Sequence, residues 1–148
     1  MEMWELAARE AVRDNIARYT HAGDRGRVND LAAVFTEGGV LHVKGREPAE
    51  GREAIARFLS GAVENGSRHD AGGRPGFVRH FVANIAFEHL SRTEIHTASY
   101  FVVFTGHGPD HWGRYRDRHV FEDGRWLIAH RYVRIDAAAS ASTMRFTN

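Results

Sequence analysis

The stretch Thr93–Asp136, TEIHTASYFVVFTGHGPDHWGRYRDRHVFEDGRWLIAHRYVRID, decides the fold. It contains three runs rich in Val, Ile, Phe, Tyr and Thr, which are typical of β-strands, and Asp123-Gly124 between the last two is a hairpin signal. A fourth run of this kind precedes it. We therefore predict an antiparallel meander of four strands: Phe77–His89, Thr93–Gly106, Trp112–Glu122 and Trp126–Asp136.

The segments before this meander have helical spacing. Apolar residues recur three and four positions apart over Trp4–Thr20, which predicts an amphipathic helix, and Gly23 is placed to end it. Residues 60–76 contain five glycines and a proline and are expected to form an irregular loop. We also predict a short helix over Val28–Phe35, a short strand over Val40–Lys44 and a helix over Arg52–Leu59.

The order of these elements predicts a single α+β domain over residues 1–148. Helices ahead of an antiparallel sheet cover one of its faces, so the mainly helical part (1–62) should pack on the sheet (77–136). Long strands twist and curl, so we expect a strongly curved sheet that forms a cone-shaped pocket, an α+β barrel. The tail, residues 137–148, is either frayed or docked on a neighbouring subunit.

The composition excludes several classes of function. The chain has 148 residues and no cysteine, so disulfides and thiolate chemistry are excluded. The formal net charge is only +1, and basic and acidic residues are interspersed, so we expect no nucleic-acid partner. The N-terminus lacks a secretory pattern and no apolar run approaches the roughly 20 residues of a membrane span. We expect a soluble cytoplasmic protein without a membrane partner.

Three polar side chains are candidates for chemistry. His80 lies among apolar neighbours on the predicted strand Phe77–His89, so it is either a core histidine or a catalytic one. Arg131 interrupts an apolar row on the last strand, and a buried charge needs a carboxylate on an adjacent strand, an anionic ligand or water. Asp24 follows the first helix, where it is either a cap for the next helix or a catalytic acid.

The sequence shows no pattern for a metal or a cofactor. His107 and His111 are four residues apart, but they flank a Gly-Pro loop and do not share a helix face. Gly72-Gly73 lacks the Lys and Ser/Thr of a phosphate-binding loop. We therefore expect neither a metal site nor a cofactor.

Nearly the whole chain resembles the SnoaL-like branch of the nuclear-transport-factor-2-like superfamily. The resemblance lies in the order of several short strings, each weak by itself. They are Tyr19–Asp24, Leu31–Thr36, Gly51–Ile55, Arg79–Asn84, Gly113–Asp117 and Asp123–Ala129.

The resemblance implies roles for the three candidates. Scytalone dehydratases and hexachlorocyclohexane dehydrochlorinases place an Asp just after the first helix and a His at the start of the strand that follows the third helix, which Asp24 and His80 match. Dehydrochlorinase-like enzymes also use an Arg five residues beyond a Trp, the position of Arg131. The chain departs from scytalone dehydratases at Gly23, where they have Tyr, and at Thr105, where they have a second His.

The activity implied by this resemblance is that of a cofactor-independent lyase, of the dehydratase or dehydrohalogenase type. An Asp24–His80 dyad would abstract a proton from a small hydrophobic or aromatic substrate, and Arg131 would stabilise the developing anion. The alternatives are a polyketide cyclase or isomerase with the same base, and a non-catalytic ligand-binding or dioxygenase-small-subunit-like domain. We expect a homodimer or homotrimer. The residues expected to contact the substrate are Tyr19, Val82, Asn84, Tyr100 and Trp112.

Overall fold

The computed structural model describes residues 1–66 and 76–142. Within these ranges no helix is long and apolar enough to cross a bilayer. The helices are α1 (Met3–Asp24), α2 (Val28–Ala32) and α3 (Arg52–Gly66). The strands are β1 (Phe35–Val43), β2 (Ala49–Glu50), β3 (Arg79–Leu90), β4 (Glu94–Thr105), β5 (Gly108–Glu122) and β6 (Arg125–Ala138).

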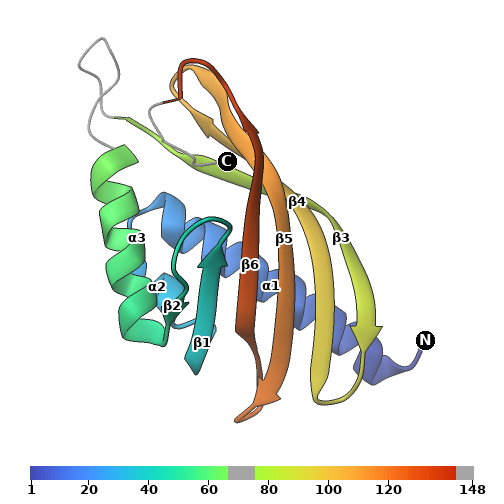
Figure 1. Ribbon diagram of the computed structural model, residues 1–148. Coiled ribbons are helices and arrows are strands. Elements are labelled where there is room, and N and C mark those ends of the chain that lie inside the picture. The colour runs from blue at the N-terminus through green and yellow to red at the C-terminus, as the bar shows by residue number, and fades with distance from the viewer. Residues whose placement is uncertain (67–75, 143–148) are drawn as a thin grey trace.

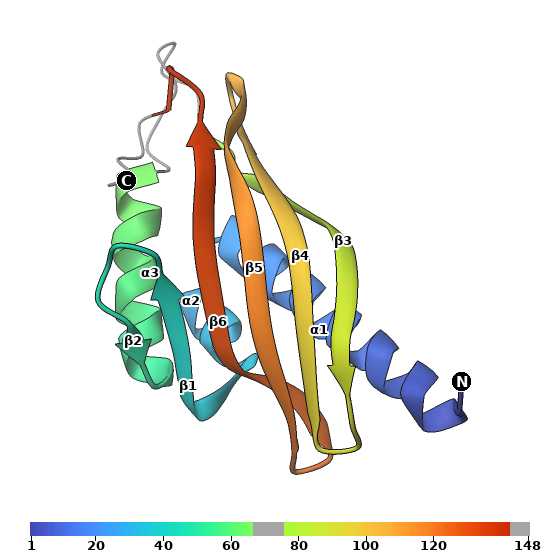
Figure 2. The same ribbon diagram turned by 45° about the vertical axis from the view of Figure 1, so that its right-hand side comes forward.

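The six strands form one curled sheet in the order β2-β1-β6-β5-β4-β3 (Figures 1 and 2). Strands β3 to β6 pair antiparallel with their neighbours in sequence, which confirms the predicted meander. Strand β1 pairs parallel with β6, so the sheet is mixed. Strands β2 and β3 stand at the two edges of this order, so the sheet is open. The predicted α+β class with a curved sheet is confirmed, but the sheet does not close into a barrel.

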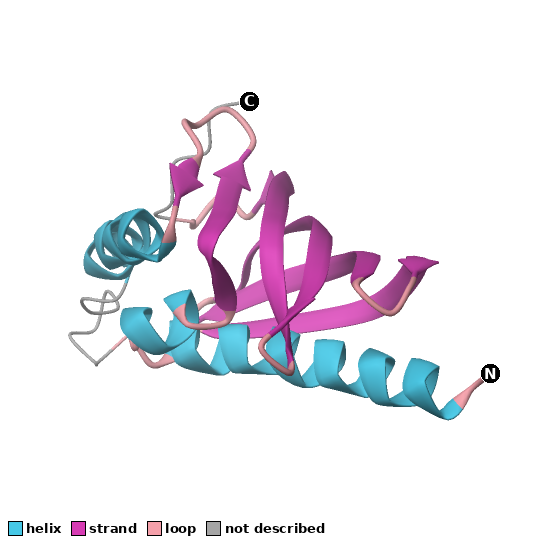
Figure 3. Ribbon diagram, turned by 90° about the horizontal axis from the view of Figure 1, so that it is seen from below, coloured by secondary structure: helices cyan, strands magenta, loops and turns pink. Residues whose placement is uncertain are grey.

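Helix α1 lies across one face of the sheet, which we call the inner face (Figure 3). Its apolar residues Val12, Ile16 and Tyr19 are buried there, as the helical spacing predicts. The helix runs past Gly23 to Asp24, and the positive φ of 68° belongs to Gly26, so the predicted cap at Gly23 is wrong. Asp24 is thus the last residue of α1 and does not cap α2.

Two apolar clusters hold the helices on the inner face. The larger one joins α1 to β4 and β5, where the Phe101 and Tyr115 rings stack 4.5 Å apart and the Tyr19 ring packs edge-on against Tyr115. The smaller one lies at the N-terminal end of α1, against Ile95 and Trp126. Both clusters bury alternate residues of the strands, the pattern expected of a sheet with one covered face.

Several boundaries differ from the prediction. Helix α2 ends at Ala32 and the next strand begins at Phe35, whose carbonyl oxygen accepts two hydrogen bonds from the Arg52 guanidinium. Helix α3 continues beyond Leu59, and the predicted loop at Gly108-Pro109 belongs to β5. Part of the predicted loop over 60–76 and part of the tail lie outside the described residues.

Gly113 on β5 lies against the backbone of β6 and leaves no room for a side chain. A Cβ atom there would lie 2.0 Å from the carbonyl oxygen of Arg134 on β6. We expect Gly113→Ala to lower the free energy of unfolding by about 1–3 kcal/mol or more, because the strands must move apart. Gly61→Ala in α3 is the control: no described atom lies within 4 Å of its Cβ, and alanine should stabilise the helix by about 0.5–1 kcal/mol. Urea denaturation measures both, and equal midpoints would contradict the expectation.

Candidate active site

A cavity of about 370 Å³ lies between the inner face of the sheet and the three helices. Its walls are mostly apolar, and its volume falls within the usual range for a small-molecule site. The polar side chains that line it come from separate segments of the chain. They are Thr20, Asp24, Arg25, Arg46, His80, Thr105, Asp110, His111 and the hydroxyl-bearing Tyr19 and Tyr115.

Asp24 and His80 meet at this cavity, as the sequence predicted. The His80 Nδ1 lies 2.5 Å from Oδ1 of Asp24, and the backbone N–H of His80 donates to Oδ2 at 3.0 Å. The side chains are 24% and 10% exposed, so they are accessible from the cavity but shielded from bulk water. An ionised carboxylate accepts only, so Nδ1 carries the hydrogen and Nε2 is the basic nitrogen.

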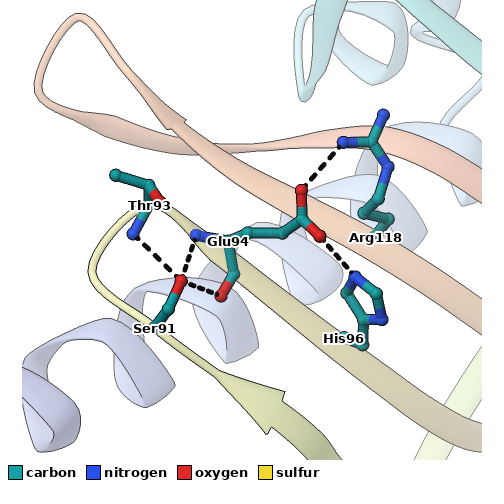
Figure 4. A network of polar contacts seen from close by, with 5 residues as sticks. All are labelled: Ser91, Thr93, Glu94, His96 and Arg118. Carbon is teal, nitrogen blue, oxygen red and sulfur yellow. Dashed lines mark hydrogen bonds and ion pairs between the residues drawn. The ribbon is translucent and has the colours of Figure 1, made fainter.

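A second histidine–carboxylate contact shows what the same pair looks like on the surface. His96 Nε2 lies 2.7 Å from Glu94 Oε1, and Arg118 donates to the other oxygen (Figure 4). Hydrogen bonds from His96 and then from Arg118 lower the pKa of Glu94. His96 does not line the cavity that holds Asp24 and His80. The cavity, more than the pairing, therefore distinguishes the Asp24–His80 dyad.

Of the five residues expected to contact the substrate, Tyr19 lines the cavity and four do not. Tyr100 and Trp112 lie on the outer face of the sheet, and Tyr100 is 56% exposed. Val82 packs into the two apolar clusters. Asn84 is exposed and has a φ of 54° where the pairing of β3 with β4 shifts register. The extra residue of this bulge reverses the alternation of the strand, which the sequence pattern did not reveal.

Arg131 does not line the cavity, contrary to the expectation that it faces a substrate. It is fully buried, and its Nε and Nη2 donate to the two carboxylate oxygens of Asp117 at 2.8 and 2.7 Å. Its guanidinium lies between the rings of Tyr19 and Tyr115, 4.2 and 4.1 Å from their centroids. Burial by itself lowers the pKa of Arg131, but the Asp117 carboxylate outweighs it and the net pKa is raised. The cross-strand register places Asp117 opposite Arg131. The two residues therefore form a structural ion pair inside the sheet.

His119 is the buried neighbour of this ion pair. Its Nε2 shares a hydrogen bond of 3.0 Å with the Thr97 hydroxyl, and its Nδ1 has no partner among the described residues. Burial lowers the pKa of His119 to about 4. This imidazole is therefore neutral in the folded protein and belongs to the core.

The sequence pattern missed the pair Asp110–His111 at the start of β5. Both residues are buried, both line the cavity, and His111 Nδ1 lies 2.7 Å from Asp110 Oδ2. In the sequence, His111 stands out only for its spacing of four residues from His107. Its alternation with Tyr115 and Asp117 along the strand was the available signal, since these residues share the inner face. Within the described ranges no three His, Asp or Glu side chains are grouped to hold a metal ion.

Comparison with known proteins identifies the family. The SnoaL-like domain matches residues 4–132, which is most of the chain. The chain belongs to the SnoaL-like family. No curated protein matches this SnoaL-like chain in sequence.

Solved structures agree with this assignment. A structure from Catenulispora acidiphila, solved in complex with S-DNPA, is 32% identical, with a TM-score of 0.74 over 88% of this chain and 95% of that one. A candidate scytalone dehydratase from Novosphingobium aromaticivorans is 23% identical, with a TM-score of 0.82 over 100% and 96%. An NTF2-like protein with a cystatin-like fold from the same species is 22% identical, with a TM-score of 0.73 over 95% and 91%. The last two similarities concern the fold alone.

The buried ion pair predicts a large effect of removing its cation. Arg131→Met leaves the Asp117 carboxylate buried without a counter-charge, so we expect a loss of about 3–5 kcal/mol in the free energy of unfolding. Arg114→Met is the control, because Arg114 pairs with Asp136 on the same two strands but both side chains are exposed. Its loss should stay below about 1 kcal/mol. Similar losses for the two variants in urea denaturation would contradict the structural role of Arg131.

His119 predicts a dependence of stability on pH. The unfolded chain binds a proton at His119 below about pH 6.5, whereas the folded chain does so only near pH 4. Stability should therefore fall as the pH drops from about 6.5 to 4, by on the order of 3 kcal/mol. His119→Gln, whose amide can reach Thr97, should remove this part of the slope. Urea denaturation at a series of pH values measures it, and identical slopes would refute the assignment.

Proposed function

We propose that this protein is a cofactor-independent lyase in which the Asp24–His80 dyad abstracts a proton from a small hydrophobic substrate. The observation that carries the proposal is a histidine held by a carboxylate in the wall of an apolar cavity. Membership of the SnoaL-like family supports it, and so does the similarity in fold to a candidate scytalone dehydratase. A relative that was solved in complex with S-DNPA supports a bound ligand for this chain.

The geometry of the dyad suits a general base. The carboxylate of Asp24 holds the Nδ1–H of His80, which fixes the tautomer and directs basicity to Nε2. The second carboxylate oxygen holds the backbone N–H of the same residue, so the ring and its strand are positioned together. A base placed in this way removes a proton from carbon and contributes about 10²–10⁴-fold to the rate.

The lining of the cavity indicates the substrate class. Most of its walls are aliphatic and aromatic, so burial of an apolar ring is favourable by about 25 cal/mol per Å². Its polar side chains include two histidines, His80 and His111. A hydrophobic carbonyl compound with an acidic C–H next to its carbonyl and a leaving group one carbon further fits both features. The residues that form the apolar walls are Val28, Leu31, Leu41, Val43, Phe58, Leu59, Val78, Phe101, Val103, Val133 and Ile135.

Elimination from β-hydroxy aryl ketones tests this function, because the enone product absorbs in the near ultraviolet. His80→Ala should lower kcat by about 10²–10⁴-fold through loss of the base. Asp24→Asn should lower it at least about tenfold, because the amide still accepts the His80 backbone N–H but no longer stabilises the imidazolium. His96→Ala, which removes the surface histidine paired with Glu94, should leave kcat unchanged.

The outcomes separate the alternatives. Circular dichroism and melting temperature establish that each variant is folded. A substrate rearranged without loss of a group would identify an isomerase or cyclase with the same base. Tight binding of the ketones without turnover would identify a ligand-binding domain and refute the lyase.

A further inference from the structure

The two carboxylates in the wall of the cavity already have partners. Asp24 contacts the His80 ring and accepts a hydrogen bond from the His80 backbone N–H. Asp110 lies 2.7 Å from His111 Nδ1 and accepts a hydrogen bond from the Ser142 hydroxyl at 2.8 Å. Within residues 1–66 and 76–142, neither carboxylate forms an ion pair with an arginine. The arginines that line the cavity are therefore not neutralised by direct contact with these acids.

Two arginines, Arg25 and Arg46, line the same cavity, and they differ in their surroundings. The Arg46 guanidinium lies over the ring of Phe58, 5.9 Å from its centroid. The Arg25 guanidinium has no hydrogen bond, ion pair or ring contact with any other described residue. Because Arg25 is exposed and still lines the cavity, it lies at the mouth. A guanidinium in this position is a permanent positive charge with five N–H donors.

The turn that follows α1 fixes the point from which this side chain leaves the backbone. The N–H groups of Arg25 and Arg27 donate to the carbonyl oxygen of Ala22 at 3.3 and 2.9 Å. Gly26 between them has a positive φ of 68°, which allows the chain to turn here. Arg25 is thus held directly after Asp24, the residue whose carboxylate orients the imidazole at the cavity.

A cation at this place also has a structural explanation, which the neighbouring arginine shares. Positive charges near the C-terminus of a helix are favourable by about 0.3–1 kcal/mol. Arg25 and Arg27 both follow the last residue of α1, and both are exposed. Of the two, Arg25 lines the cavity, whereas Arg27 lines only a separate groove beside α1. A comparison of the two arginines therefore separates a role at the helix end from a role in the cavity.

The ligand that matches these surroundings has an apolar body and one negative charge. The walls of the cavity are mostly aliphatic and aromatic, so an apolar body is favoured inside. At the mouth, the planar guanidinium presents paired N–H donors that match the two oxygens of a carboxylate. A dianion such as a phosphate matches less well, because Asp24 and Asp110 line the same cavity and repel the second charge. These features together favour a monocarboxylate.

We infer that Arg25 binds a carboxylate group of the ligand at the mouth of the cavity. The ligand is then an organic acid whose apolar body fills the cavity and whose charged end stays near water. That this ligand is a substrate rests on the function proposed above, and the lyase then acts on hydrophobic acids. Arg25 is a binding residue in this scheme and takes no part in proton transfer.

Isothermal titration calorimetry with two matched probes tests the inference. Naphthylacetate and naphthylacetamide share the same apolar body, but only the first carries a charge at neutral pH. We expect the wild type to bind the acid about five- to tenfold more tightly than the amide, which is the size of one charge-assisted contact near water.

Three variants separate the cavity from the helix end. Arg25→Gln keeps a polar side chain but removes the charge, so the two probes should bind within about twofold of each other. Arg25→Lys keeps the charge without the planar fork and should retain part of the preference. Arg27→Gln is the matched control: it removes a charge from the same helix end and should leave the preference of the wild type unchanged. Circular dichroism and melting temperature establish that each variant is folded.

Salt gives a second measurement that needs no variant. A contact between two charges weakens as the ionic strength rises, whereas burial of the naphthyl ring does not. The preference of the wild type for the acid should therefore shrink as the NaCl concentration is raised from about 0.05 M to about 0.5 M. A preference that does not depend on salt would contradict an ion pair with Arg25.

Equal affinities of the wild type for the two probes, or binding of neither, would overturn the inference. Equal losses of preference in Arg25→Gln and Arg27→Gln would also overturn it, because the helix end alone would then account for the effect. These results do not bear on the ketone assay of His80→Ala, which tests proton transfer. A wild type that prefers the acid but converts no ketone would refute the proposed lyase, and the carboxylate site would stand.

Discussion

The burial of one guanidinium constrains most of this structure. Arg131 carries a permanent charge in a place that water does not reach, so it must be matched by a carboxylate and by polarisable surfaces. Asp117 supplies the charge from β5, and Tyr19 and Tyr115 supply two aromatic faces. The contact thereby joins α1, β5 and β6. Asp24 follows Tyr19 by five residues on the same helix, so the interaction that fixes Tyr19 also determines where Asp24 meets the sheet.

Three of the histidines differ in the group that holds them. His80 and His111 each bond to a carboxylate, which fixes the tautomer of the ring. His119 bonds to the Thr97 hydroxyl, which offers no such charge, and it stays neutral in the core. His80 and His111 line the cavity, and His119 is enclosed by the core. Among these three histidines, the two that bond to a carboxylate are also the two that line the cavity.

The backbone geometry of the strands decides which side chains reach the cavity. A positive φ at Asn84 inserts an extra residue into β3 and reverses its alternation, so His80 points inward while Asn84 is exposed. On β4 the alternation sends Phe101 inward and Tyr100 outward, whereas on β5 the register shifts beside His111, and the adjacent residues Asp110 and His111 both line the cavity. One residue of shift in β3 would turn His80 away from the cavity.

Period and turn chemistry are local in the chain, so the sequence by itself predicted the helices and the four long strands. The pairing of Asp24 with His80, which are 56 residues apart, was implied only by the family resemblance. The sequence also marked Arg131 as a charge that needs a partner. Only the tertiary structure decided that this partner is Asp117, that Tyr100 and Trp112 face away from the cavity, and that His111 lines the same cavity as His80. These facts depend on register and on a bulge, which arise from contacts between strands and leave no mark in the sequence of either strand alone.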